Sequence, residues 1–202
     1  MNDINIFKYT VELEDSIWEN FTDIYERTVN PDDREPVDLY KKSLNSGASE
    51  LYLLTLNGEL IGFYLIDVHS LFNMLNHLSI IVKQRRRGYA LELLQHLKEK
   101  STLENKYIIV ETLFNPRPIF KEVGFKELKM NFYAPSFVVP GKLFNFRLLI
   151  WGYHFFKLHV TYEQMVDIVK DIYSVTHYLD DNDEIVKKSI STIKNPLELI
   201  DL

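Results

Sequence analysis

The chain has 202 residues, a length that suits one globular domain with an appendage and is too short for two full catalytic domains. Hydrophobic residues make up 46% of it and charged residues 26%, which excludes a disordered, collagen-like or fibrous protein. The 29 acidic against 23 basic residues argue against a nucleic-acid binder that relies on a basic surface, and the absence of cysteine excludes disulfides, thiolate metal sites and a cysteine nucleophile.

The first 68 residues predict a strand, two helices and a hairpin. A short strand over residues 5–13 precedes helical patterns over residues 16–24 and 37–44. Residues 51–56 and 60–68 flank Asn57-Gly58, and these two residues tolerate the positive φ angles that tight hairpin turns require. This pair of segments therefore predicts two antiparallel strands.

The middle of the chain continues with alternating elements. Residues 75–82 predict a strand that ends in a short apolar run, as expected for a buried strand. An amphipathic helix begins after Gly88, because Ala90, Leu94 and Leu97 fall on one helical face. We expect a strand over residues 107–113, a short helix that is broken at Gly124, and a strand over residues 125–133.

The pattern changes beyond Pro140. An aromatic-rich segment over residues 144–156 is followed by a helix that opens at Thr161–Gln164, and a last helix follows Asn182. We therefore predict a main domain over residues 1–140 and an extension over residues 141–202, in which the aromatic-rich segment and the helices pack on that domain. The aromatic-rich segment suits the core, the surface of a homodimer or the lining of an acceptor site.

The chain shows no sign of export or membrane insertion. Its N-terminus has neither the basic flank nor the apolar core of a signal peptide. The longest apolar stretch is too short to span a bilayer and is interrupted by Arg147. We predict a cytoplasmic protein that binds no membrane and no nucleic acid.

The loop between the strand over residues 75–82 and the following helix has the chemistry of an anion site. Amides at a helix N-terminus are unsatisfied donors at the positive end of the helix dipole. Gly88 allows close approach of the backbone, Ala90 avoids a bulky side chain, and Lys83 and Arg85–Arg87 supply charge that complements a pyrophosphate. The alternative is a solvated basic turn.

The same loop carries a family resemblance. RRRGYA, Arg85–Ala90, resembles the (Q/R)xxGx(G/A) acetyl-coenzyme A motif of the GNAT N-acetyltransferase family, and it stands between a predicted strand and a predicted helix as in that family. IFKEVGF, Ile119–Phe125, resembles the family's (F/Y)YxxxGF segment. The order of elements over residues 5–133 is also similar. The resemblance implies an α/β fold with a mixed, mostly antiparallel sheet that is flanked by helices and followed here by the helical extension.

The resemblance also implies acetyl-coenzyme A (acetyl-CoA) as co-substrate. The residues that would hold its pyrophosphate are Arg85, Arg86, Arg87, Gly88, Tyr89 and Ala90. The strand end at Ile80, Ile81 and Val82 would offer backbone groups to the pantetheine arm, where the fourth and fifth strands splay apart. Asn115 would lie near the pantetheine or thioester, and Phe120 would be a wall of the channel.

Two residues are candidates for the chemistry of acetyl transfer, which needs a deprotonated amine and a proton source for the leaving thiolate. Glu111 interrupts an apolar strand near its end, where it would act as general base or attract a cationic amine; alternatively it faces solvent or pairs with an arginine. The family's usual tyrosine is replaced by Phe120, which has no proton to give. Tyr133 is the candidate replacement, and a structural tyrosine with solvent as the acid is the alternative.

The leading prediction is an N-acetyltransferase that transfers acetyl directly to a primary amine of a small molecule or a protein. Direct attack is preferred because the chain has no cysteine and no GxSxG motif. No metal is expected, since the six histidines lack metal-site spacing. The first 40 residues carry eleven acids and three bases, which favours a cationic acceptor or serves solubility. The alternative function is a non-catalytic acyl-CoA-binding module with a regulatory or interaction role.

Overall fold

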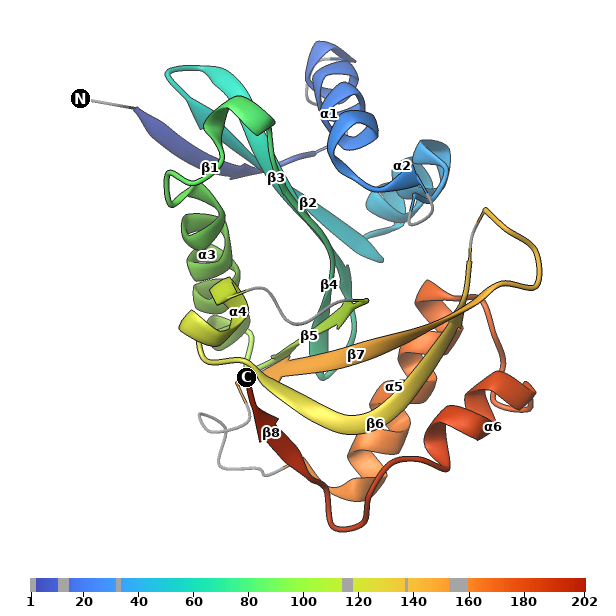
Figure 1. The fold of residues 1–202 in the computed structure, drawn as a ribbon. Coiled ribbons are helices and arrows are strands. Elements are labelled where there is room, and N and C mark those ends of the chain that lie inside the picture. Colours follow the sequence, from blue (N-terminus) through green and yellow to red (C-terminus); the bar gives the residue numbers. More distant parts are fainter. Residues whose placement is uncertain (1–2, 11–14, 32–33, 114–117, 137, 153–159) are drawn as a thin grey trace.

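A single mixed sheet organises the chain. The computed structural model describes residues 3–10, 15–31, 34–113, 118–136, 138–152 and 160–202. In this described part, eight strands lie in the order β1-β2-β3-β4-β5-β7-β6-β8, and all neighbours are antiparallel except β4 and β5 (Figure 1). The strands are β1 (Ile4–Lys8), β2 (Ser49–Leu56), β3 (Glu59–Val68), β4 (Phe72–Ile80), β5 (Tyr107–Thr112), β6 (Lys126–Pro135), β7 (Leu143–Trp151) and β8 (Leu199–Asp201). The predicted fold class, a mostly antiparallel sheet flanked by helices, is confirmed.

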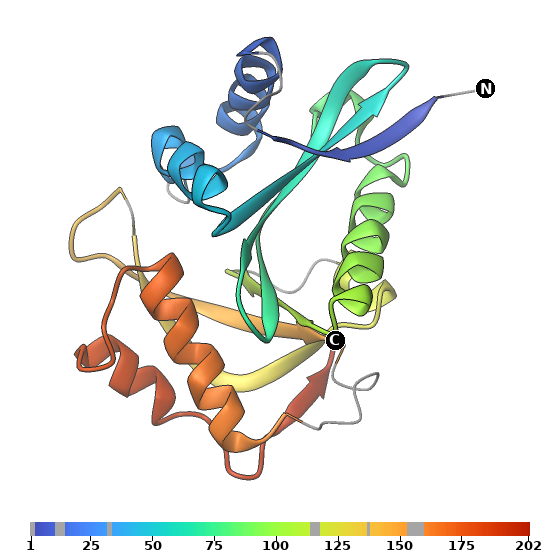
Figure 2. The same cartoon turned by 180° about the vertical axis from the view of Figure 1, so that it is seen from behind.

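Helices cover both faces of this sheet. They are α1 (Asp15–Thr28), α2 (Val37–Ser46), α3 (Tyr89–Leu103), α4 (Pro118–Glu122), α5 (Tyr162–Thr176) and α6 (Glu184–Ile190), with a 3-10 turn, η2, over Val82–Gln84. One face carries α3 and α4. The opposite face carries α1 and α2 over the N-terminal half and α5 and α6 over the C-terminal half (Figures 1 and 2). Three buried apolar clusters fill these layers, one beneath each pair of helices.

The hairpin of β2 and β3 shows how local sequence sets the fold. Asn57 and Gly58 adopt φ angles of 52° and 82°, as the turn signal predicts. Further along β3, Gly62 permits a close approach to β4, because a Cβ atom there would lie 2.6 Å from the backbone oxygen of Ser79. The two strands therefore pack more closely than a side chain at residue 62 would allow.

The C-terminal part contributes to the sheet as well as to its cover. The segment that contains most of the predicted aromatic-rich stretch is β7, which hydrogen-bonds to β5 on one side and β6 on the other. The short strand β8, which the sequence patterns did not indicate, pairs with β6. The helix predicted to open at Thr161 is confirmed as α5, with Thr161 and Gln164 forming a capping box. The division of the chain at residue 140 stays a prediction.

The sheet opens between its two halves. The parallel ladder of β4 and β5 extends only from Phe72 and Tyr107 to Leu75 and Val110. Beyond it, β4 continues along β3 to Ile80, whereas the end of β5 pairs with β7. A bulge that leaves Asn76 without a partner position in β3 bends β4 where the ladder ends. The two strands diverge from this point (Figure 1).

Candidate active site

The opening exposes backbone groups on the inner edge of β4. Ile81 donates its N–H to the carbonyl oxygen of Ile61 in β3 at 2.9 Å. Because backbone groups alternate in direction along an antiparallel strand, those of Leu78 and Ile80 face away from β3 and toward the opening. The backbone of Ile80 is thus available for the pantetheine contact that the family resemblance implies, and this role stays a prediction. The strand ends two residues earlier than predicted, since Val82 begins the 3-10 turn η2 and Ile81 bonds to β3.

The basic loop presents free amides at the start of α3. Gly88 has a φ of 91°, and the space that its Cβ would occupy is open. Its carbonyl oxygen accepts from the N–H groups of Leu91 and Glu92, which starts the helix. Within the described part of the chain, the N–H groups from Arg86 to Ala90 donate to no backbone carbonyl. Such a set of amides at a helix N-terminus has the chemistry of an anion site, and the predicted role of this loop stays a prediction.

The loop's cations are divided between structure and solvent. Arg85 donates from Nε to the carbonyl oxygen of Ile80 at 2.9 Å, so it folds onto the end of β4. Lys83 contacts Glu59 at 2.5 Å in an exposed ion pair, and it is thus turned toward β3 rather than toward the loop amides. Arg86 and Arg87 are exposed. Two exposed arginines beside free amides fit a diphosphate, the charged group that acetyl-CoA carries.

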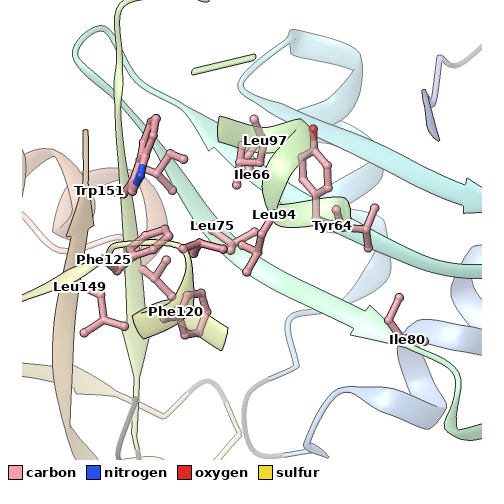
Figure 3. Packing of buried hydrophobic residues seen from close by; sticks show 14 of the residues in the cluster. Tyr64, Ile66, Leu75, Ile80, Leu94, Leu97, Phe120, Phe125, Leu149 and Trp151 are labelled. Atoms are coloured by element: carbon pink, nitrogen blue, oxygen red, sulfur yellow. The ribbon is translucent and has the colours of Figure 1, made fainter. Parts of the chain in front are cut away.

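Side chains on the α3 face form an apolar wall. Tyr89 is buried there, so only its backbone faces the loop. Phe120, on α4, packs edge-on against Phe125 with ring centroids 5.2 Å apart. Figure 3 shows these two rings together near Leu149, and Ile80 apart from them at the end of its strand. The position of Phe120 is consistent with its predicted role as a wall of the cofactor channel. Asn115, the other predicted contact of the pantetheine arm or thioester, lies outside the described residues.

Glu111 lies at the opening on the face opposite α3. In β5, Val110 packs into the cluster under α3 and α4, and its neighbours Ile109 and Glu111 point to the face covered by α5. Nε2 of His177, at the end of α5, lies 3.0 Å and 3.3 Å from the two carboxylate oxygens of Glu111. Within the described residues, Glu111 therefore neither faces open solvent nor pairs with an arginine, the two structural alternatives that its sequence left open.

Two more carboxylates are buried on the same face. Asp67, near the end of β3, accepts from the hydroxyls of Ser49 at 2.6 Å and Thr176 at 3.1 Å. Glu35 lies between α1 and α2. Its backbone N–H donates to the Tyr25 hydroxyl, and the same hydroxyl donates to its backbone carbonyl. Burial, followed by the negative charge of Asp67, raises the pKa of Glu35 to about 7. A carboxyl group with such a pKa changes its charge near neutral pH.

Tyr133 is held among residues of the C-terminal helices. The ammonium group of Lys188 lies 4.2 Å from the centre of its ring, and its backbone carbonyl accepts from the Tyr173 hydroxyl at 2.6 Å. Its N–H donates to the Ser189 hydroxyl at 3.1 Å. The interactions found for it within the described residues do not join it to Glu111. Its predicted role as proton donor stays a prediction.

Sequence reasoning missed three of the polar residues on this face: Glu35, Asp67 and His177. Asp67 carried a usable signal, because it interrupts the apolar strand LIGFYLIDV as Glu111 interrupts YIIVETL. Glu35 and His177 carried none, since an acid in an acidic loop and a histidine at a helix end are ordinary there.

Elsewhere, His77 bonds to the Tyr40 hydroxyl at 2.9 Å, and burial lowers its pKa to about 4, which agrees with a structural histidine.

No metal centre is evident in the part of the chain that the structure describes: no three histidine, aspartate or glutamate side chains there are arranged to hold a metal ion. The helices of that part are also too short or too polar to cross a membrane.

Known proteins share this architecture. The family model described as acetyltransferase (GNAT) domain matches residues 23–137. A GNAT-family acetyltransferase from Bacteroides thetaiotaomicron has a similar structure, with a TM-score of 0.69 and 14% identity over 87% of this chain and 99% of that one. The ribosomal-protein-S18-alanine N-acetyltransferase from Escherichia coli matches with a TM-score of 0.55 and 17% identity, over 74% and 92% of the two chains. A GNAT acetyltransferase from Elizabethkingia anophelis with acetyl-CoA bound matches with a TM-score of 0.53 and 18% identity, over 73% and 95%. No curated protein matches the sequence.

Proposed function

Because the chain belongs to the GNAT acetyltransferase family, we propose that it transfers the acetyl group of acetyl-CoA directly to a primary amine of a small molecule or a protein. Acetyl-CoA, when bound, supplies the acetyl group as a thioester. The amides from Arg86 to Ala90, with Arg86 and Arg87, bind the pyrophosphate. The backbone of Ile80 and Leu78 orients the pantetheine arm at the opening between β4 and β5.

The observation that carries this proposal is the position of Glu111. Its carboxylate stands at the opening, on the face opposite the α3 loop, so an amine reaches it from the side that the co-substrate does not occupy. A protonated amine has no free lone pair, and Glu111 removes that proton directly or through a water molecule. The new N–C bond then forms as the C–S bond breaks, the acylated nitrogen releases its second proton to water, and the leaving sulfur takes up a proton from solvent or from Tyr133.

The face that Glu111 occupies favours a cationic acceptor. Glu35 and Asp67 are buried on the same face, and both lie close enough to influence one another's charge. A positively charged amine would neutralise part of this charge before it loses its own proton. The name of the Escherichia coli neighbour gives a protein alanine as acceptor, which supports protein amines as one class beside small amines.

Two measurements test the function. Calorimetric titration with acetyl-CoA measures binding, and a thiol-reactive dye measures CoA release in the presence of di- and polyamines, amino acids and peptides with free N-termini. The absence of cysteine makes the dye assay free of protein background. We expect binding together with amine-dependent CoA release, and mass spectrometry of the product should show one added acetyl group.

The same measurements decide between catalysis and the non-catalytic alternative. That alternative is favoured by Phe120, which stands where the family segment usually has a tyrosine. Binding of acetyl-CoA without CoA release for every amine class would contradict the enzyme and support an acyl-CoA-binding module. Failure to bind acetyl-CoA would contradict both.

A further inference from the structure

The last turn of α5 reaches across the opening of the sheet. The Tyr173 hydroxyl donates to the backbone of β6, and the Thr176 hydroxyl bonds to Asp67 in β3 at 3.1 Å. The next residue, His177, contacts Glu111 in β5. Three residues within five positions therefore join the C-terminal helix to both halves of the sheet. The helix supports the floor of the opening instead of covering a distant surface.

His177 is fixed from three sides. Its ring centroid lies 5.8 Å from that of Phe132 on β6 and 5.8 Å from that of Tyr173 on α5. Nε2 then lies between the two oxygens of Glu111, at 3.0 Å and 3.3 Å. The side chain of His177 is 3% exposed and that of Glu111 is 11% exposed. His177 is thus the inner member of the pair, and Glu111 is the member that a substrate can reach.

We propose that His177 is a positioning residue, which holds the Glu111 carboxylate in the orientation that receives the amine proton; this inference rests on the proposed function of Glu111. A glutamate at the end of a strand has three rotatable side-chain bonds, and each unfixed bond spreads the carboxylate over several rotamers. A hydrogen bond from an immobile imidazole selects one of them. Precise placement matters because a misplacement of about 1 Å can cost roughly a hundredfold in rate.

The neighbouring charges give a second reason for the pair. Burial, the charge of Asp67 and to a lesser degree that of Glu111 raise the pKa of Glu35, and His177 acts in the opposite direction on it. Without a partner, Glu111 would turn away from the buried acids toward solvent. The contact with His177 keeps it on the inner side of the opening. An extension that follows the matched family segment in sequence thereby takes part in the site.

Three variants separate positioning from simple support of the fold. His177→Leu removes the donor but keeps an apolar side chain among the rings. His177→Gln keeps an N–H donor at the length of Nε2. Thr176→Val, the matched control, removes the neighbouring bond between α5 and the sheet and leaves the Glu111 contact intact. For an amine that the wild type acetylates, we measure kcat, the KM for each substrate and the unfolding temperature.

We expect His177→Leu to lower kcat by roughly 10–100-fold with little change in the KM for acetyl-CoA. His177→Gln should restore most of this loss, and Thr176→Val should lower the unfolding temperature without a comparable loss of kcat. The proposal is wrong if His177→Leu keeps the wild-type kcat, if Gln restores none of it, or if Thr176→Val lowers kcat as much as His177→Leu does.

A spectroscopic measurement tests the pair independently of turnover. In protein with 15N-labelled histidine, the ring nitrogen resonances of His177 report the contact with Glu111. They should shift in Glu111→Gln and stay in place in Thr176→Val; unchanged resonances in Glu111→Gln would overturn the inference. If the wild type acetylates no amine, the proposed function fails, and this spectrum still shows whether the pair exists.

Discussion

Replacement of Glu35 by glutamine should stabilise the protein, and the gain should depend on pH. Glu35 is 8% exposed and lies near two other carboxylates, Asp67 and Glu111. Burial, followed by the charge of Asp67, raises its pKa to about 7 from an ordinary value of 4.5. The folded chain therefore keeps the Glu35 proton through a pH range in which the unfolded chain has lost it.

The sign and size of the effect follow from this difference. A raised pKa contributes stability that is complete below pH 4.5 and is lost as the pH rises to about 7. One pKa unit corresponds to about 1.4 kcal/mol, so ionised Glu35 costs the folded state about 3 kcal/mol above pH 7. At pH 5 the cost is less than about 1 kcal/mol. Glutamine has a similar shape and no charge, so it avoids the cost at every pH.

Urea unfolding at pH 5 and pH 8 measures the difference. We expect Glu35→Gln to raise the free energy of unfolding by about 2–3 kcal/mol at pH 8 and by less than about 1 kcal/mol at pH 5. Glu26→Gln, at an exposed position on α1, is the control and should change it by less than about 0.5 kcal/mol at both pH values. An equal gain at both pH values, or no gain at pH 8, would refute the reasoning.

Three further predictions concern the loop, the carboxylate and the C-terminal part. Gly88→Ile should weaken acetyl-CoA binding at least about tenfold, about 1.4 kcal/mol, in a calorimetric titration. The control Gly47→Ile, at another open glycine with positive φ, should not weaken it. Unchanged affinity in folded Gly88→Ile would contradict the anion site. Glu111→Gln should lower turnover most at neutral pH, with partial relief as the pH approaches the amine's own pKa and little change in acetyl-CoA affinity; a wild-type pH–rate profile would remove Glu111 from the mechanism. Truncation after Pro140 removes β7 from between β5 and β6 and should cost solubility; a truncated chain that stays monomeric, soluble and equally heat-stable would contradict this.

Much of the fold was predictable because its signals are local. The hairpin depends on Asn57 and Gly58, which adopt the positive φ angles that the turn requires. The α5 helix depends on the capping box of Thr161 and Gln164, which lie within one turn of each other. The anion loop is also a continuous run of sequence between a strand and a helix. Each of these features is decided by residues that are close in the chain.

The arrangement of β7 was not predictable in this way. Its residues are aromatic and apolar, a composition that suits a core, a dimer surface or a strand equally well. It becomes a strand because β5 and β6 both offer unpaired edges, and it is inserted between them out of chain order. That choice is made by tertiary pairing, which leaves no periodic signal in the segment itself.

The polar face of the opening was predictable only in part, for a related reason. Glu111 and Asp67 interrupt apolar strands, and a charge in such a strand calls for a partner. The partner of Glu111 on β5 is His177, which lies 66 positions away at the end of α5. A sequence pattern shows that a partner is needed, but only the packed fold shows which residue provides it.

The buried acids of this face are costly to the fold, and their cost bears on their role. The Asp67 carboxylate accepts hydrogen bonds from two hydroxyl groups, and the Glu111 carboxylate contacts the imidazole of His177. Glu35 interacts with the Tyr178 hydroxyl and with His177, which already contacts Glu111, yet burial and the charge of Asp67 still raise its pKa to about 7. Stability alone would favour a neutral side chain at residue 35. At neutral pH, glutamate at this position makes folding less favourable than glutamine would. Such a residue is expected where the bound acceptor, rather than the protein, supplies the compensating positive charge.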